Sequence, residues 1–178
     1  ASPRDLRGTA APSLRHVRAA RPDGRAMLVI PGGGYEYVSV EGGRGVADRL
    51  ARHGITCFVL EYRLPIDGWT PRADIPLQDA QRAIRLIRTR AADYGVDPAR
   101  IGVIGFSSGG HVAASLAVGN EDAVYAPIDL ADRLTARPAV AGLVYPVTTL
   151  RTAGPLSKSR ANLLGPAPTA AQLSRYAA

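Results

Sequence analysis

Four short, largely apolar runs alternate with amphipathic stretches along this chain, and this alternation constrains the fold more than any other feature. The runs comprise residues 26–30, 55–62, 101–106 and 139–145. Strands that are apolar on both faces are typical of a parallel sheet that helices cover on both sides. The sequence therefore predicts the α/β class, with a doubly wound and mostly parallel sheet. The weaker, alternating residues 14–19 predict an antiparallel edge strand ahead of the others.

The segments between the predicted strands repeat apolar residues at helical spacing. Residues 46–51 form one predicted helix, which Gly54 ends, and residues 108–117 form another, which Gly119 ends. A short helical segment is also expected at residues 170–176. Helices placed between parallel strands act as crossover connections, and active sites in such folds lie at the carboxyl ends of the strands.

The longest predicted helix covers residues 77–91, where apolar side chains form one continuous stripe. Its polar side chains fall on the opposite face, so Gln81, Arg82, Arg85 and Arg88 are expected to point outward.

A sequence Gly-Phe-Ser-Ser-Gly at residues 105–109 contains the pattern Gly-x-Ser-x-Gly. The pattern is common by chance, so its context decides the interpretation. A predicted strand enters it, a predicted helix leaves it, and small residues flank Ser107, as a tight strand-to-helix turn requires. Ser107 is therefore the candidate nucleophile, and a helix-capping serine is the alternative. For Ser108 we expect the backbone N–H to be the useful group and the side chain to be incidental.

Three consecutive glycines follow the first core strand, in the sequence Pro-Gly-Gly-Gly-Tyr at residues 31–35. Glycines let the backbone turn its N–H groups toward a site without steric cost. Together with a serine elbow downstream, this loop is expected to supply amides to an oxyanion hole. A flexible turn is the alternative interpretation.

With both motifs present, the chain resembles the esterase/lipase branch of the α/β-hydrolase superfamily, and within it bacterial acetyl xylan esterase-like and feruloyl esterase-like carboxylesterases. Two departures are visible: Pro31 stands where many relatives have histidine, and Ser108 stands where alanine is common. The resemblance covers most of the chain from about residue 25, and its motifs are residues 31–35, 61–65, 76–80, 97–101 and 105–111.

The resemblance implies a serine esterase that forms an acyl-enzyme on Ser107 while the amides of Gly33, Gly34 and Ser108 hold the oxyanion. It implies short acyl esters of the acetyl type as substrates, either small molecules or carbohydrate esters. No cofactor and no metal are expected.

The resemblance also implies that Tyr35 and Tyr37, next to the glycines, lie near the acyl pocket. For each of them an exposed position on the loop is the alternative.

A serine nucleophile needs a histidine base and an acid, and the sequence offers no well-placed candidate for either. His16 precedes the core strands, His53 ends a helix at the opposite edge of the sheet, and His111 lies on the same helix as Ser107 and one turn away. We expect His111 to support the site through hydrogen bonds rather than to act as the base. The aspartates after the elbow, Asp122, Asp129 and Asp132, come too early in the chain to be the acid.

We therefore expect residues 1–178 to be the N-terminal, nucleophile-bearing part of a single α/β-hydrolase domain. A companion C-terminal segment or fragment of the same protein would supply the acid and the histidine. It would also cover the edge of the fourth core strand.

Composition excludes several other classes. The net charge of +7 comes from scattered arginines without interleaved aromatics, so no nucleic-acid partner is expected. No apolar stretch reaches the roughly 18 residues of a membrane span, and the single cysteine, Cys57, is expected to pack in the core. The first residue is not methionine, which favours a secreted or periplasmic protein over a cytoplasmic one.

Two alternatives remain open from the sequence. One is a binding protein that keeps the fold without catalysis, with Ser107 reduced to a turn residue. The other is a peptidase of the prolyl-oligopeptidase type, although the glycine loop favours esters.

Overall fold

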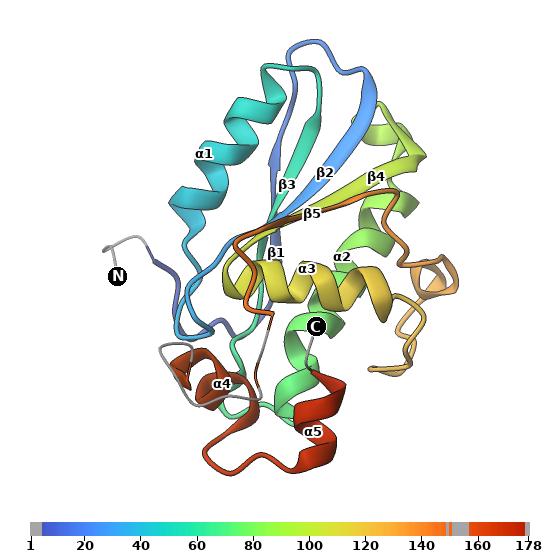
Figure 1. Cartoon of the computed structure of the whole chain (residues 1–178). Coiled ribbons are helices and arrows are strands. Elements are labelled where there is room, and N and C mark those ends of the chain that lie inside the picture. Colours follow the sequence, from blue (N-terminus) through green and yellow to red (C-terminus); the bar gives the residue numbers. More distant parts are fainter. Residues whose placement is uncertain (1–4, 149, 151–156, 177–178) are drawn as a thin grey trace.

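A mixed sheet organises the protein (Figure 1). The computed structural model describes residues 5–148, 150 and 157–176. Within them the sheet has five strands in the order β1-β3-β2-β4-β5, with β1 antiparallel to β3 and the other neighbours parallel. The strands are β1 (Ser13–Val17), β2 (Gly24–Ile30), β3 (Thr56–Glu61), β4 (Val96–Phe106) and β5 (Ala141–Val144).

All four predicted core strands and the antiparallel edge strand are confirmed. The main difference is β4, which begins five residues before the predicted run, at Val96. Its first part is polar and mostly exposed, and Val96 pairs with Gly24 ahead of an irregularity in the register. Apolar content alone could not reveal this extension, because four of its five side chains are exposed.

Helices cover both faces of the sheet, as expected for a doubly wound fold (Figure 1). Strand β2 shows how: Leu28 and Ile30 join the larger core, and Val29, between them, joins a smaller core on the other face with Ala47 and Cys57. The helices are α1 (Val40–Ala51) on the smaller core, α2 (Ile75–Thr89) and α3 (Ser108–Val118) on the larger one, and the short α4 (Ser157–Leu164) and α5 (Ala170–Arg175). Short 3-10 turns lie at Pro65–Asp67, Arg72–Asp74, Ala92–Tyr94 and Leu130–Arg133.

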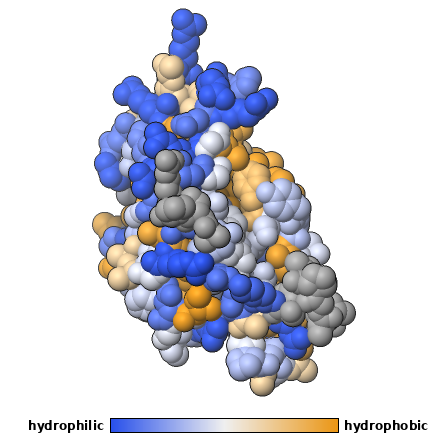
Figure 2. All heavy atoms as spheres, turned by 90° about the vertical axis from the view of Figure 1, so that its left-hand side faces the viewer, coloured by the Kyte–Doolittle hydropathy of each residue, from blue (hydrophilic) through white to orange (hydrophobic). Residues whose placement is uncertain are grey.

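Helix α1 begins six residues earlier than its predicted start at residue 46. Glycines in its first turns disfavour a helix by intrinsic propensity, but packing requires one of them. A Cβ at Gly43 would lie 2.6 Å from Pro31 Cγ and 2.9 Å from Val59 Cγ1. Gly43 therefore lets α1 approach the sheet closely. The outer surface on the side of the molecule that carries α1 is largely hydrophilic (Figure 2).

The polar face of α2 does not point outward as predicted. Gln81 is 1% exposed and donates to the carbonyls of Gly119 and Asp122. Arg82, Arg85 and Arg88 are only partly exposed, because the connection between α3 and β5 lies across them. A polar pattern shows that a face is not in the apolar core, but it cannot show that another segment covers it.

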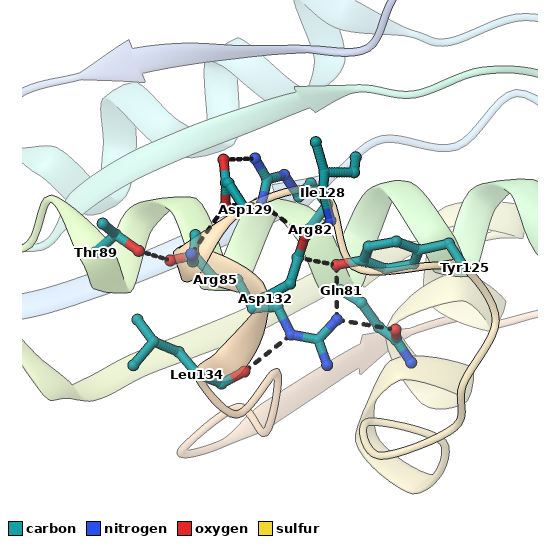
Figure 3. Close-up of polar contacts among 10 residues, drawn as sticks. Gln81, Arg82, Arg85, Thr89, Tyr125, Ile128, Asp129, Asp132 and Leu134 are labelled. Atoms are coloured by element: carbon teal, nitrogen blue, oxygen red, sulfur yellow. Dashed lines mark hydrogen bonds and ion pairs between the residues drawn. The ribbon is translucent and has the colours of Figure 1, made fainter.

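The arginines of α2 hold this connection through specific bonds (Figure 3). Arg82 pairs with Asp129 at 2.6 Å and with Asp132 at 3.0 Å. Arg85 donates to the Tyr125 hydroxyl at 2.6 Å and to the Leu134 carbonyl at 2.9 Å. The Asp132 side chain is only 1% exposed and also accepts hydrogen bonds from Tyr125 and from the Ile128 amide.

We expect Asp132→Ala to lower the free energy of unfolding by about 2–3 kcal/mol, because it leaves the Tyr125 hydroxyl and the Ile128 amide without their acceptor and removes one of the two carboxylates that pair with Arg82. The matched control is Arg90→Ala, which removes an ion pair to Asp93 in which both side chains are at least 60% exposed. That change should cost less than about 0.5 kcal/mol. Urea denaturation of both variants checks this, and equal losses would contradict it.

Candidate active site

Ser107 stands at a sharp turn between β4 and α3. Its backbone has φ 52° and ψ −119°, which a non-glycine residue adopts only under strain of about 1–3 kcal/mol. The surrounding backbone holds it there: the Ser107 amide donates to the Val144 carbonyl at 3.1 Å, and its carbonyl accepts from the amides of His111 and Val147. The turn therefore presents the serine at the carboxyl end of β4, where neighbouring loops meet.

The two glycines of the Gly-x-Ser-x-Gly pattern are required by close backbone approaches. A Cβ at Gly105 would lie 2.1 Å from the Gly109 carbonyl oxygen, and a Cβ at Gly109 would lie 2.3 Å from the Ile30 carbonyl oxygen. Neither space can accommodate a methyl group. The pattern thus marks the point where α3 starts directly against the end of β2.

The glycine loop after β2 is a hydrogen-bonded turn and not a loose connection. The Gly33 carbonyl accepts from the Glu36 amide at 3.0 Å and the Gly32 carbonyl accepts from the Ser39 amide at 3.0 Å. Gly33 and Gly34 have φ 145° and 63°, and a Cβ at Gly33 would lie 1.9 Å from the Tyr37 carbonyl oxygen. This loop lies beside the elbow, since a Cβ on Gly32 would be 3.2 Å from Ser107 Cβ.

A cleft of about 380 Å³ opens between the elbow and the glycine loop. Tyr37 lies in its wall, and so does Tyr145, whose side chain is 72% exposed. The first turns of α1 close one side, where Gly42 and Gly43 lie between Ser39 and Val46. The lining residues are Pro31, Gly32, Gly33, Gly34, Tyr37, Ser39, Gly42, Gly43, Val46, Phe106, Ser107 and Tyr145.

Tyr35 corrects an expectation, because it neither lines the cleft nor lies on the surface. Its side chain is fully buried, and its hydroxyl lies 2.6 Å from His111 Nδ1. The other ring nitrogen of His111, Nε2, lies 2.7 Å from the Tyr176 carbonyl oxygen. Because both nitrogens have partners, His111 is not free to take a proton from Ser107. Burial lowers its pKa, which keeps the ring neutral.

Ser108 corrects a second expectation. Its side chain is not incidental, because it is fully buried and its Oγ accepts a hydrogen bond of 2.9 Å from the Gly34 amide. The structure therefore brings Gly33, Gly34, Ser107 and Ser108 together, but with the Gly34 amide already occupied. The serine found where relatives commonly have alanine was the one signal in the sequence that could have drawn attention to this side chain.

The remaining titratable candidates lie elsewhere. His16 stacks on Phe58 with ring centroids 5.0 Å apart, and His53 lies in the turn after α1. Asp129 and Asp132 are bound to Arg82. All three histidines of the chain are thus within the described residues, and the structure brings none of them to Ser107 as a free base. Cys57 packs in the smaller core, where burial raises the pKa of its thiol to about 12.

Within the residues that the structure describes, no helix is long and apolar enough to cross a membrane.

We expect Gly109→Ala to lower the free energy of unfolding by about 3 kcal/mol or more, because its methyl group collides with the backbone of Ile30 and Pro31. Gly45→Ala is the matched control: a Cβ added to this helical glycine would meet no atom within 4 Å, so alanine should stabilise by about 0.5–1 kcal/mol. Thermal denaturation followed by circular dichroism compares them. A neutral Gly109→Ala would mean that α3 is not seated against β2 as described.

Comparisons with known proteins agree with this geometry. The BD-FAE family model matches residues 18–144. The chain is 37% identical over 150 residues to endo-1,4-beta-xylanase B of Butyrivibrio fibrisolvens, covering 84% of this chain and 23% of that protein. It is 33% identical over 130 residues to an acetylxylan esterase of Xylanibacter ruminicola, covering 72% of this chain and 24% of the relative.

A solved structure extends the match to the fold. The acetyl ester-xyloside bifunctional hydrolase of Caldicellulosiruptor lactoaceticus superposes with a TM-score of 0.77 at 35% identity, covering 93% of this chain and 60% of that one. This chain thus spans about a quarter of the two curated relatives and 60% of the solved structure. From the family match, the elbow and the sheet, the chain belongs to the BD-FAE family, in the esterase branch of the α/β-hydrolases.

Proposed function

We propose that this chain carries the nucleophile of a carboxylic ester hydrolase. The observation that carries the proposal is the strained backbone of Ser107, which is held between β4 and α3 and lines the cleft. The Ser107 hydroxyl oxygen attacks the ester carbonyl carbon, the alcohol leaves, and an acyl-enzyme remains. Water then attacks the same carbonyl carbon, releases the carboxylic acid and restores the serine.

Backbone amides beside Ser107 are proposed to stabilise the oxyanion. Ser108 is the first residue of α3, so its amide has no carbonyl partner inside the helix. The Gly33 amide has no acceptor among the described residues and belongs to the loop that lies beside Ser107. The Gly34 amide could add a third donor only by sharing its bond to Ser108 Oγ. Each such donor typically contributes about 3 kcal/mol to the transition state.

The base and the acid are proposed to come from polypeptide outside this sequence. A serine hydroxyl needs a base at neutral pH, and the three histidines of the chain are either hydrogen-bonded to other groups or distant from Ser107. A companion segment that follows β5 in the sheet would place such groups at the carboxyl ends of the strands. Tyr145, exposed at the end of β5, would then lie near this junction.

We propose short acyl esters as substrates, including acetyl groups on carbohydrate. The names of two relatives support this, an acetylxylan esterase and an acetyl ester-xyloside hydrolase. Tyr37 and Tyr145 line the cleft and offer aromatic surface on its walls. A secreted or periplasmic location would suit a polymeric carbohydrate substrate.

We expect a fluorophosphonate probe to form a covalent adduct on Ser107 in the complete, folded protein. Ser107→Ala should abolish labelling, because the attacking oxygen is removed. Ser39→Ala is the matched control, since Ser39 lines the same cleft and should not affect the adduct. Mass spectrometry of the labelled peptides identifies the site. If the folded wild type gives no adduct on Ser107, the chain is a non-catalytic binding protein instead.

We also expect acetyl esters to be hydrolysed with a kcat/KM at least about tenfold above that for twelve-carbon acyl esters. A tenfold difference corresponds to about 1.4 kcal/mol of transition-state binding. p-Nitrophenyl acetate and laurate, which share one leaving group, isolate the effect of the acyl chain. Comparable or faster turnover of laurate would refute the preference for short acyl groups.

A further inference from the structure

Helix α3 contacts the glycine loop at two adjacent points. Ser108 Oγ accepts the Gly34 amide at 2.9 Å, and His111 Nδ1 lies 2.6 Å from the Tyr35 hydroxyl. Ser108 and His111 are three residues apart, so they lie on the same face of the helix. The contacted residues, Gly34 and Tyr35, are consecutive and form the C-terminal end of the glycine loop.

The hydrogen atoms of the first contact can be assigned. Because Ser108 Oγ accepts from Gly34, the hydrogen of the Ser108 hydroxyl remains available to another acceptor. At the start of the loop, the Tyr62 hydroxyl donates to the Pro31 carbonyl at 3.1 Å. Side-chain hydroxyls therefore bond both ends of the glycine loop, Ser108 at Gly34 and Tyr62 at Pro31.

The hydrogen atoms of the second contact can be assigned as well. The Tyr176 carbonyl only accepts, so His111 Nε2 carries the hydrogen. A neutral ring then leaves Nδ1 as an acceptor, and the Tyr35 hydroxyl donates to it. Tyr35 has φ 59°, a conformation that disfavours a non-glycine residue, and this bond helps to hold it there.

A loop with three consecutive glycines samples many conformations unless other groups restrain it. Oxyanion stabilisation depends on donors that are oriented before the reaction, and displacement by about 1 Å can reduce the rate by about 100-fold. Both contacts restrain the loop from the helix that begins at the nucleophile. The position of the loop is therefore set relative to Ser107 itself.

We infer that Ser108 and His111 are positioning residues that hold the glycine loop against the elbow, with the Gly34 amide bonded to Ser108 and the oxyanion left to the Gly33 and Ser108 amides. The catalytic consequence rests on the proposed function. The hydrogen-bonded arrangement itself does not, so the two can be tested separately.

The test combines amide hydrogen exchange with probe labelling in the folded protein. In Ser108→Ala, the Gly34 amide loses its acceptor and should exchange about tenfold faster by NMR. Fluorophosphonate labelling of Ser107 should slow by about tenfold, because the loop donors are no longer held in place. Ser115→Ala, which removes a hydroxyl further along the same helix, is the matched control and should change neither readout.

Tyr35→Phe provides an independent variant, because it removes only the hydroxyl that His111 accepts. Tyr35→Phe should also slow the labelling of Ser107. The control Tyr94→Phe changes a partly exposed tyrosine beyond the C-terminal end of α2 and should not slow it. Urea denaturation of every variant establishes that the changes are not a loss of folding.

Two results would overturn the inference. One is unchanged exchange of the Gly34 amide in Ser108→Ala. The other is labelling of that variant at or above the wild-type rate, which would show that a released Gly34 amide serves the oxyanion. If wild-type Ser107 is not labelled at all, the proposed function fails, and the exchange measurement still decides the role of Ser108.

Discussion

The site depends on the close approach of α3 to the end of β2. Gly109 lies so near the carbonyls of Ile30 and Pro31 that no side chain fits between them. This contact exists because β2 and β4 are parallel neighbours, so their carboxyl ends meet at one edge of the sheet. The elbow after β4 and the glycine loop after β2 are thereby fixed side by side, and the cleft forms between them.

Local sequence patterns predicted much of this arrangement. The apolar runs located the strands, and the Gly-x-Ser-x-Gly context located the turn, because both reflect local geometry. The predictions that were wrong depend on contacts with segments that are distant in the sequence. Gln81 is polar yet buried under the connection to β5, Tyr35 turns inward to His111, and α1 starts among glycines because Gly43 packs on Pro31.

The structure explains the positions of three arginines on α2. Arg82, Arg85 and Arg88 bind the segment between α3 and β5 through carboxylate and carbonyl oxygens. This segment leads into β5, whose Val144 carbonyl accepts the Ser107 amide. Charged residues on α2 therefore support the strand that flanks the nucleophile. Some of the arginines therefore make internal hydrogen bonds and ion pairs, and they do not form a binding surface for polyanions.

The most direct test of the account is a crystal structure of the protein with a phosphonyl group on Ser107. The phosphoryl oxygen stands in for the oxyanion of the tetrahedral intermediate. We predict that it lies about 2.7–3.1 Å from the amide nitrogens of Gly33 and Ser108, while the Gly34 amide stays on Ser108 Oγ. A phosphoryl oxygen that points to solvent, or that accepts from Gly34 in place of Gly33, would contradict the account.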